Sequence, residues 1–299
     1  MFGQLLTRYR ELNDMTQKSL AEELSFHSEE LRGLNAVTIS RWETGTTTPG
    51  ISKKREVLKF LAQRGCLREE EGCLELFSAR YRRLDGRLRE IFDRRYQYVV
   101  GNYPDFGIDE YRLIPLRKHE ESDRHLEHLM DIERVTNAEG YYTPDLDTLG
   151  RWVEHPGCFT VICERKGRNL GHFMMIKLSS DVAREIAYHR REEFAIGPED
   201  LRGPEERGSY YIHALYGSNP HVAALLNIRA YLHFLRYFYT IEDVVIFSTR
   251  PDGPKITRDY GIALVAEGRH ERFGFPWYGM LSPVEDILFA DGMIRTLFP

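Results

Sequence analysis

AVTISRWETGTTTPG, residues 36–50, is the stretch that decides how the first part of this 299-residue chain folds. Ile39 and Trp42 have the spacing of one inward face of a short helix. Asn35 can cap this helix at its start, and Gly45 can end it. The residues left to face solvent are Thr38, Ser40 and Arg41. The stretch therefore predicts a short helix with an apolar inner face and a polar outer face, followed by a threonine-rich loop.

Helical patterns flank this stretch on both sides. Residues 4–13 carry an apolar stripe, and Thr16 can cap a second helix over 17–24. Pro49 breaks the chain before a helical pattern resumes over 52–63. The inward apolar positions of these segments are Leu5, Leu6, Tyr9, Leu12, Leu20, Ala21, Leu24, Val57, Leu58 and Leu61. Together the segments predict a small all-α domain.

The order of these segments resembles the helix-turn-helix domain of the Cro/repressor (XRE) family over about residues 4–64. TQKSLAEEL matches the first helix of the motif, TISRWETG matches the recognition helix, and the segment from Pro49 to Leu61 matches the fourth helix. The resemblance implies binding to double-stranded DNA, because the recognition helix fits the major groove. It also implies that Glu43 forms an ion pair with Arg10.

The resemblance assigns DNA contacts residue by residue. Gln17 is expected to contact a phosphate. The residues expected to read base edges are Ala36, Val37, Thr38, Ser40 and Arg41. The loop residues expected to touch the DNA backbone are Thr44, Thr46, Thr47 and Thr48. Loop hydroxyls suit phosphate oxygens and fix the register of a protein on DNA without reading its sequence.

One segment departs from the family pattern. Residues 25–35 replace the usual short turn with a longer stretch that includes Glu29 and Glu30. This stretch is either an extra turn of helix that repacks the motif or an acidic flap that weakens DNA binding.

Composition limits the class of protein. The apolar fraction of 42% is ample for ordinary hydrophobic cores, and a chain of this length usually forms two domains. The net charge of −5 argues against uniform coating of nucleic acid. Residues 1–65 hold ten Lys or Arg against eight Asp or Glu, a charge of +2 that leaves −7 for the remainder.

The sequence also favours a cytoplasmic protein. No apolar run is long enough to span a membrane, and the amino-terminal segment lacks the apolar core of a secretion signal. Cys66, Cys73, Cys158 and Cys163 include no CxxC pair, which indicates buried thiols rather than a zinc site or a disulfide frame. We therefore expect no metal. His125 and His128 could face a metal on one helix, but no third ligand stands beside them in the sequence.

Residues 66–110 predict a helical connector. Its apolar positions follow a spacing of three and four residues, and they are Leu74, Phe77, Tyr81, Leu84, Leu88 and Ile91. This seam favours a homodimer, because paired heads double the contacts that one small DNA-binding domain makes. The alternative is that the stripe packs on a neighbouring domain.

Residues 111–299 predict an α+β domain with a mixed central sheet. The expected order is a strand at 111–117, helices at 125–137 and 143–154, a hairpin at 158–179 and a strand at 209–217. A helix starting at Asn219 and Pro220, a strand at 244–250, a helix from 254 and a further strand complete the pattern. The charged stretch from 180 to 208 is interpreted as an insertion.

This order resembles the acyl-CoA N-acyltransferase (GNAT) fold over roughly residues 111–285. The family holds the pyrophosphate of CoA on backbone N–H groups at a helix start, which corresponds here to YGSNPHVAA, residues 216–224. Pro220 has no N–H to give, and the second glycine of the family loop is absent. Thr257 stands where the family often has a general-acid tyrosine, and Tyr260 is displaced from that place. Acyl-CoA is therefore a possible cofactor that the motifs support only in part.

A V-shaped opening between the fourth and fifth strands is the predicted ligand site. Its expected ligand-binding residues are Tyr211, His213, Tyr216, Asn219, Thr249, Arg250 and Tyr260. Apolar and aromatic walls with a few polar groups are typical of small-molecule sites. His213 could also be a catalytic base, but the sequence assigns no catalytic residue.

The sequence thus predicts a multidomain protein. An XRE-type DNA-binding domain at 1–65 precedes a connector at 66–110 and a GNAT-like domain at 111–299. The function predicted first is a cytoplasmic, dimeric transcriptional regulator whose GNAT-like domain senses a small-molecule effector or mediates assembly. The alternative is an active acyl-CoA-dependent N-acyltransferase with a DNA-binding head. A third reading makes the last domain a protein-docking module.

Overall fold

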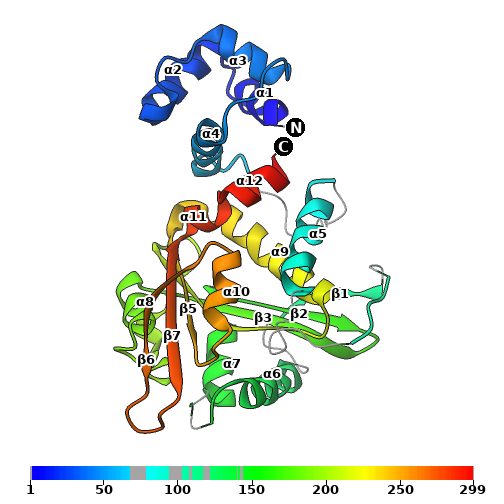
Figure 1. The fold of residues 1–299 in the computed structure, drawn as a ribbon, viewed down its shortest axis with the longest axis vertical. Helices are drawn as coiled ribbons and strands as arrows, with labels where there is room; N and C mark the ends of the chain where they lie inside the picture. The colour runs from blue at the N-terminus through cyan, green and yellow to red at the C-terminus, as the bar shows by residue number, and fades with distance from the viewer. Residues whose placement is uncertain are drawn as a thin grey trace. The chain divides into compact units, whose positions relative to one another are not determined.

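A computed structural model describes residues 2–67, 79–93, 103–107, 110–116, 122–139, 141 and 144–298. The chain forms two compact units (Figure 1). The helical unit comprises residues 1–84 together with 288–299, and the α+β unit comprises residues 85–287. Among the described residues, none of the helices is both long and apolar enough to cross a membrane.

The helical unit is built as the apolar patterns predicted. Its elements are α1 (Phe2–Leu12), α2 (Gln17–His27), the short 3-10 turn η1 (Glu29–Leu31), α3 (Ala36–Glu43), α4 (Ile51–Gln63) and α12 (Asp291–Leu297). Ile39 and Trp42 are buried, which confirms the inward face of the quoted stretch. The other buried apolar side chains include Leu6, Tyr9, Leu20, Leu24, Val57, Leu58, Phe60 and Leu61. Two predicted positions differ, because Leu12 is exposed and Leu5 is only half-buried.

Local hydrogen bonds set the ends of α2 and α3. Thr16 accepts a hydrogen bond from the backbone N–H of Ser19, and Asn35 accepts one from the N–H of Thr38. Both caps satisfy N–H groups that a helix start leaves without partners. Gly45 follows α3 with a φ of +73°, a conformation that favours glycine.

Within residues 25–35, the stretch up to Leu31 is mostly helical, and residues 32–35 connect it to α3. Helix α2 continues to His27, and η1 buries Leu31 in the core of the helical unit. Glu29 and Glu30 stay exposed, and the Oε1 atom of Glu30 accepts a hydrogen bond of 3.0 Å from Ser52. The extra residues therefore add apolar packing to the helical unit.

The segment 288–298 belongs to the helical unit. Lys54 of α4 is buried, and its Nζ atom donates a hydrogen bond of 2.9 Å to the carbonyl oxygen of Phe298. Arg55 donates to the carbonyl oxygen of Phe289 and pairs with Asp291. The buried apolar side chains of this segment are Leu288, Phe289, Ile294, Leu297 and Phe298. The predicted sequence boundaries had placed these residues with the α+β domain.

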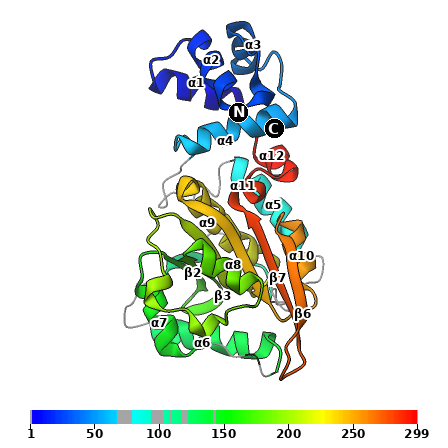
Figure 2. The same cartoon turned by 90° about the vertical axis from the view of Figure 1, so that its left-hand side faces the viewer.

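The α+β unit is organised around one mixed sheet (Figures 1 and 2). Its strands are β1 (Arg112–Pro115), β2 (Cys158–Arg165), β3 (Arg168–Leu178), β4 (Gly208–Gly217), β5 (Ile241–Ser248), β6 (Ala263–Arg269) and β7 (Pro276–Pro283). Their order across the sheet is β1-β2-β3-β4-β5-β7-β6. Strands β4 and β5 are parallel, and every other neighbouring pair is antiparallel. A mixed sheet covered by helices is the α+β architecture that the sequence predicted for this part of the chain.

Helices cover both faces of the sheet. They are α5 (Ala79–Asp93), α6 (Ser122–Thr136), α7 (Leu146–Glu154), α8 (Ser180–Ala187), α9 (Pro220–Arg236), α10 (Gly253–Asp259) and α11 (Val284–Leu288), with 3-10 turns at Glu193–Ala195, Pro198–Asp200 and Phe238–Thr240. One core joins α6, α7 and α8 to side chains such as Met174 and Tyr211. Helix α9 packs on the sheet through His233, whose ring lies 4.5 Å from that of Phe159.

Strands β4 and β5 part within the sheet. Their pairing runs from Gly208 with Ile241 to Ile212 with Ile246, although β4 continues to Gly217. The register between β3 and β4 shifts at the same level, because Met174 pairs with Ala214 and Met175 pairs with Ile212. His213 is thus the extra residue of a β-bulge, a feature that re-aims side chains next to functional sites.

Two further stretches pack within the chain. Residues 180–208, interpreted as an insertion, include α8, which buries Val182, Ala183 and Ile186 in the core of the α+β unit. In the connector, Leu84, Leu88 and Ile91 are already buried in the single chain. Leu74, Phe77 and the side chain of Tyr81 lie outside the described residues. The described part of the apolar seam therefore supports packing within the chain.

Candidate functional site

A buried acid–base pair stands where β4 and β5 part. Nδ1 of His213 lies in a short hydrogen-bonded ion pair with Oε1 of Glu193. Only 1% of the His213 side chain and 4% of the Glu193 side chain are exposed. Glu193 opens the 3-10 turn after α8, so the stretch first interpreted as an insertion delivers it to the sheet.

The charge of this pair is set by its surroundings. Burial acts to lower the pKa of His213, but the charge and hydrogen bond of Glu193, with the charge of Glu133, raise it to about 9. His213 is therefore an imidazolium at neutral pH. Its Nε2 atom is buried and has no hydrogen-bond partner among the described residues. An N–H donor thus remains available at this point of the sheet.

Two tyrosines surround the carboxylate of Glu193. Tyr141 donates a hydrogen bond of 3.0 Å to Oε2 of Glu193. Burial raises the pKa of both Tyr141 and Tyr211 well above its ordinary value, and the charges of Glu193 and Glu133 add to the shift. Both phenols therefore stay protonated and can act as hydrogen-bond donors.

Glu133 of α6 is the second carboxylate of this cluster, which consists of His213, Glu193, Tyr141, Tyr211 and Glu133. Its Oε2 atom accepts a hydrogen bond of 3.1 Å from Asn137. Burial raises its pKa above the ordinary value, and the charge of Glu193 adds to this, whereas His213 and Arg250 act in the opposite direction. The side chain is half-buried. A carboxylate with a raised pKa is a better proton acceptor near neutral pH.

Aromatic rings border the cluster. The ring of Trp152 lies 5.6 Å from that of His213, edge to face. Tyr141 stacks on Phe247 at 6.1 Å, and Phe247 stacks on Trp277 at 6.0 Å. Apolar walls around a few charged groups exclude water and strengthen the electrostatic interactions between them. The arrangement can move a proton and stabilise a developing negative charge.

The predicted ligand residues fall into separate places. Tyr211, His213 and Arg250 interact electrostatically with Glu133 or Glu193. Thr249 is buried beside them and accepts a hydrogen bond from the N–H of Ala138. Tyr216 lies near the ring of His172, Asn219 caps α9, and Tyr260 packs against Phe92 of α5.

Sequence patterns did not reveal Glu133 or Glu193. Glu193 follows a run of charged residues in which no position stood out, and Glu133 sits on a helix with many charges. The one available signal was the isolated His213 in an apolar strand, because a buried imidazole needs a partner.

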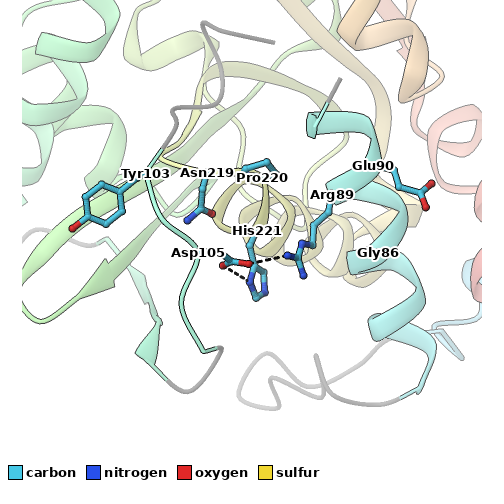
Figure 3. Close-up of a pocket in the computed structure, with 8 residues that line it drawn as sticks. All are labelled: Gly86, Arg89, Glu90, Tyr103, Asp105, Asn219, Pro220 and His221. Carbon is cyan, nitrogen blue, oxygen red and sulfur yellow. Dashed lines mark hydrogen bonds and ion pairs between the residues drawn. The ribbon is translucent and has the colours of Figure 1, made fainter. Parts of the chain in front are cut away.

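A cavity of about 440 Å³ lies at the start of α9 (Figure 3). The residues that line it are Gly86, Arg89, Glu90, Tyr103, Asp105, Asn219, Pro220 and His221. Oδ1 of Asp105 lies 3.0 Å from Nδ1 of His221, and Oδ2 accepts a hydrogen bond of 2.8 Å from Arg89. The chain's own carboxylate therefore occupies the helix start to which the GNAT resemblance assigns a pyrophosphate.

The residues at this helix start do not fit the pyrophosphate of CoA in the observed arrangement. Pro220 offers no N–H, and Oδ1 of Asn219 already accepts the N–H of Val222 at 2.8 Å. Asp105 and Glu90 add negative charge to the cavity. Binding of a second anion there requires Asp105 to move away.

Three possible metal-ligand donors come together elsewhere in the described part of the chain. The donor atoms of His189, Glu192 and His270 lie within 4.8 Å of one another. Nδ1 of His270 accepts backbone N–H groups of Arg272 and Phe273, each at 3.2 Å. In the neutral ring Nε2 then carries the proton, which disfavours metal binding through that atom. His125 and His128 gain no third donor within the described residues.

The expected DNA-reading face lies on α3. Arg41, Thr44, Thr46 and Thr47 are exposed, and 59% of Val37 is exposed. Ala36, Thr38 and Ser40 are half-buried. Arg10 donates a hydrogen bond of 2.8 Å to Glu43, which agrees with the expected ion pair. Gln17 donates one of 2.7 Å to the same carboxylate, so its amide also holds α2 against α3.

Comparisons with known proteins find likeness only in structure. No family model matches the sequence, and no curated protein matches it. The N-acyl amino acid synthase FeeM from uncultured soil microbes aligns with a TM-score of 0.40 and 14% identity, over 58% of this chain and 91% of that one. An N-acetyltransferase from Staphylococcus aureus Mu50 aligns with a TM-score of 0.38 and 8% identity, over 58% and 97%. An aminoglycoside N(6′)-acetyltransferase from Legionella pneumophila aligns with a TM-score of 0.36 and 11% identity, over 60% and 94%. The likeness concerns the course of the chain and assigns no function to it.

Proposed function

We propose that the α+β unit transfers an acyl group to an amine. The observation that carries the proposal is the buried His213–Glu193 pair, which presents an unpartnered Nε2 where β4 and β5 part. Glu133 supplies a proton acceptor with a raised pKa in the same electrostatic cluster. Two groups whose pKa values are shifted for different tasks are typical of acid–base catalysis.

The residues would divide the reaction between them. The neutral amine attacks the carbonyl carbon of the acyl donor, which forms a C–N bond and places negative charge on the carbonyl oxygen. The Nε2–H of His213 donates a hydrogen bond to that oxygen, and Glu193 holds the imidazolium in place. Glu133 takes the proton that the amine nitrogen loses. The leaving group departs as the C=O bond re-forms, and it receives the proton from Glu133.

An acyl-CoA remains the donor that the family resemblance leads us to expect. None of the steps assigned to His213, Glu193 and Glu133 depends on how the carrier of the acyl group is bound. The carrier enters through the start of α9 only if Asp105 leaves it.

An acyl-transfer assay tests the proposal. Acetyl-CoA and longer acyl-CoAs would be incubated with a panel of amines, and both thiol release and amide product would be measured. Glu193→Gln and His213→Gln should each lower kcat/KM by about 100-fold or more, because charge stabilisation at the carbonyl oxygen is lost. Glu192→Gln is the matched control, because this neighbouring carboxylate contacts His189 instead. Equal losses in Glu192→Gln and Glu193→Gln, or no transfer by the unaltered protein, would rule out this role.

We propose DNA binding by the helical unit as a second function. The exposed polar face of α3 and the network of Arg10, Gln17 and Glu43 favour it, since this network fixes α3 against the two preceding helices. The α+β unit would then transfer acyl groups, or respond to an effector, while the helical unit holds the protein at a site on DNA. A small-molecule effector and a homodimer are compatible with this role, and the cytoplasm is the compartment in which it would operate.

Selected-site DNA binding tests the second function. Operator sequences would be selected from a random library and then measured at several salt concentrations. Arg41→Ala should weaken specific binding by about 1 to 3 kcal/mol if Arg41 reads a base, and the salt slope should stay the same. Arg32→Ala is a control on an exposed arginine that pairs with Glu29. Identical binding by Arg41→Ala and the unaltered protein would show that α3 does not read DNA through this residue.

A further inference from the structure

The start of α9 brings together groups that favour an anion. Helix α9 is 17 residues long, and a helix start carries partial positive charge. Arg89 approaches it from α5, and His221 lies in its first turn (Figure 3). The side chain of His221 is only 7% exposed, and its Nε2 atom has no hydrogen-bond partner in the described part of the chain. The nearest carboxylate oxygen to Nε2 is that of Asp85, at 3.7 Å, which is too far for a hydrogen bond.

Asp105 is the anion that this site holds in the observed structure. Besides its contacts with Arg89 and His221, its Oδ1 atom accepts hydrogen bonds from Tyr111, at 3.0 Å, and from the N–H of Phe106, at 2.9 Å. Burial acts to raise the pKa of Asp105, but its hydrogen bonds with His221 and Tyr111 and the nearby charges of His221 and Arg89 hold it below its ordinary value. The carboxylate is therefore ionised at neutral pH.

The segment around Asp105 lies along the helix start as a strap, defined here as residues 103–107. The N–H of Tyr103 donates a hydrogen bond of 2.8 Å to the carbonyl oxygen of Ser218. Asn219 donates one of 3.1 Å to the carbonyl oxygen of Pro104. These two bonds tie the strap to the loop between β4 and α9. Among the described residues, these two bonds and the contacts of Asp105 link the strap to the start of α9. Because 42% of the Asp105 side chain is exposed, its carboxylate can leave this site without opening the core.

We infer that the strap is an autoinhibitory element, in which Asp105 competes with a phosphate-bearing ligand for Arg89, His221 and the start of α9. Two anions cannot share this site at low cost, so the ligand binds only when Asp105 leaves it. The inference rests on the proposed function only in taking the ligand to be the phosphate-bearing carrier of the acyl donor.

Release of Asp105 also changes the surroundings of α5. Arg89 lies on α5 and donates to Oδ2 of Asp105, so a ligand that displaces the carboxylate also takes Arg89 from it. Asp85 of the same helix lies near His221. Arg89 and His221 therefore link ligand binding at the start of α9 to the contacts of α5.

Pyrophosphate binding to the full chain tests the inference. Calorimetric titration with inorganic pyrophosphate should show that Asp105→Ala binds at least about tenfold more tightly than the unaltered protein, because a competing charge is gone. Asp105→Asn keeps the shape and the hydrogen bond to Tyr111, so it tests the loss of charge with little change in packing. Asp131→Asn is the matched control, because Asp131 is an exposed carboxylate of α6 that pairs with Arg134 and does not line the cavity. It should change affinity by less than about threefold.

Hydrogen exchange supplies a second measurement. In the unaltered protein, saturating pyrophosphate should speed exchange of the Tyr103 and Phe106 amides, whose hydrogen bonds hold the strap. Equal pyrophosphate affinity in Asp105→Ala and the unaltered protein, equal gains in Asp105→Ala and Asp131→Asn, or unchanged exchange with pyrophosphate bound would each overturn the inference. Acyl transfer is a separate readout. If the pyrophosphate results are as expected but acyl transfer is absent, only the proposed function is ruled out. If acyl transfer is intact but Asp105→Ala and the unaltered protein bind pyrophosphate equally, only the autoinhibitory role of the strap is ruled out.

Discussion

Lys54 and Phe298 are joined by a buried hydrogen bond of 2.9 Å between a side-chain ammonium and a backbone carbonyl. The two residues stand 244 positions apart in the sequence, yet both belong to the helical unit. Burial lowers the pKa of Lys54, so the carbonyl of Phe298 offsets part of the cost of placing an ammonium there. This bond fastens the segment 288–298 to α4.

Lys54→Met should destabilise the helical unit. Methionine keeps the apolar stem but leaves the Phe298 carbonyl without its donor, which should cost about 1 to 2 kcal/mol in the free energy of unfolding. Chemical denaturation followed by near-ultraviolet circular dichroism measures the loss. Lys53→Met is the neighbouring control and should change stability by less than about 0.5 kcal/mol. Equal stability of the two variants would show that the bond to Phe298 contributes nothing.

Gly3→Ala should loosen the contact between α1 and α3. A Cβ atom on Gly3 would stand 2.3 Å from the carbonyl oxygen of Trp42, so one of the two helices must shift. Overpacking of this kind costs about 1 to 3 kcal/mol. Gly50→Ala is the control, because a Cβ there meets nothing within 4 Å. Thermal unfolding of the two variants compares them, and a stability loss in Gly50→Ala alone would contradict the expected packing.

The His213–Glu193 pair should make stability depend on pH. The pKa of His213 in the folded protein is raised from 6.5 to about 9. Its contribution to the free energy of unfolding is therefore fully present below pH 6.5 and is lost as the pH rises through about 9. Between pH 6.5 and 8, the free energy of unfolding of the unaltered protein should fall by on the order of 1 to 2 kcal/mol relative to that of His213→Gln. Burial lowers the pKa of Lys177 to about 8, so loss of its proton above that pH increases stability, opposite to the effect of His213. Parallel pH profiles for the two proteins would argue against a charged His213.

The pH dependence of acyl transfer should have two limbs. The rate should rise as Glu133 loses its proton, above the ordinary pKa of 4.5, and fall near pH 9 as His213 loses its own. Glu133→Gln should abolish the acid limb and lower kcat about 100-fold or more, while KM changes little. Glu139→Gln is a control on an exposed carboxylate in the turn that follows α6. An unchanged acid limb in Glu133→Gln would assign the base to another group.

Local signals in the sequence carried much of the fold. The caps at Thr16, Asn35 and Asn219 each take the backbone N–H that their position predicts, because capping depends only on residues three positions apart. The hairpin between β2 and β3 turns at Lys166 and Gly167, both with positive φ. Short-range patterns of this kind need no tertiary information.

Long-range contacts were less visible. Glu193 reaches His213 across 20 positions, and no spacing rule links a residue after α8 to the middle of β4. Asp105 lies in a stretch whose glycine and proline content is typical of a linker, yet its carboxylate meets a helix that starts 115 positions later. Periodicity records which side of an element is buried, but it does not record which distant residue covers that side.

The place of residues 288–298 in the helical unit has a consequence for synthesis of the protein. A ribosome releases α1 to α4 first, but their core lacks Phe289, Ile294 and Leu297 until the whole α+β unit has been translated. Domains generally fold as they emerge, so the α+β unit has all its strands before the helical unit has all its core. A nascent chain that stalls before residue 288 would therefore carry a complete sheet and an unfinished head.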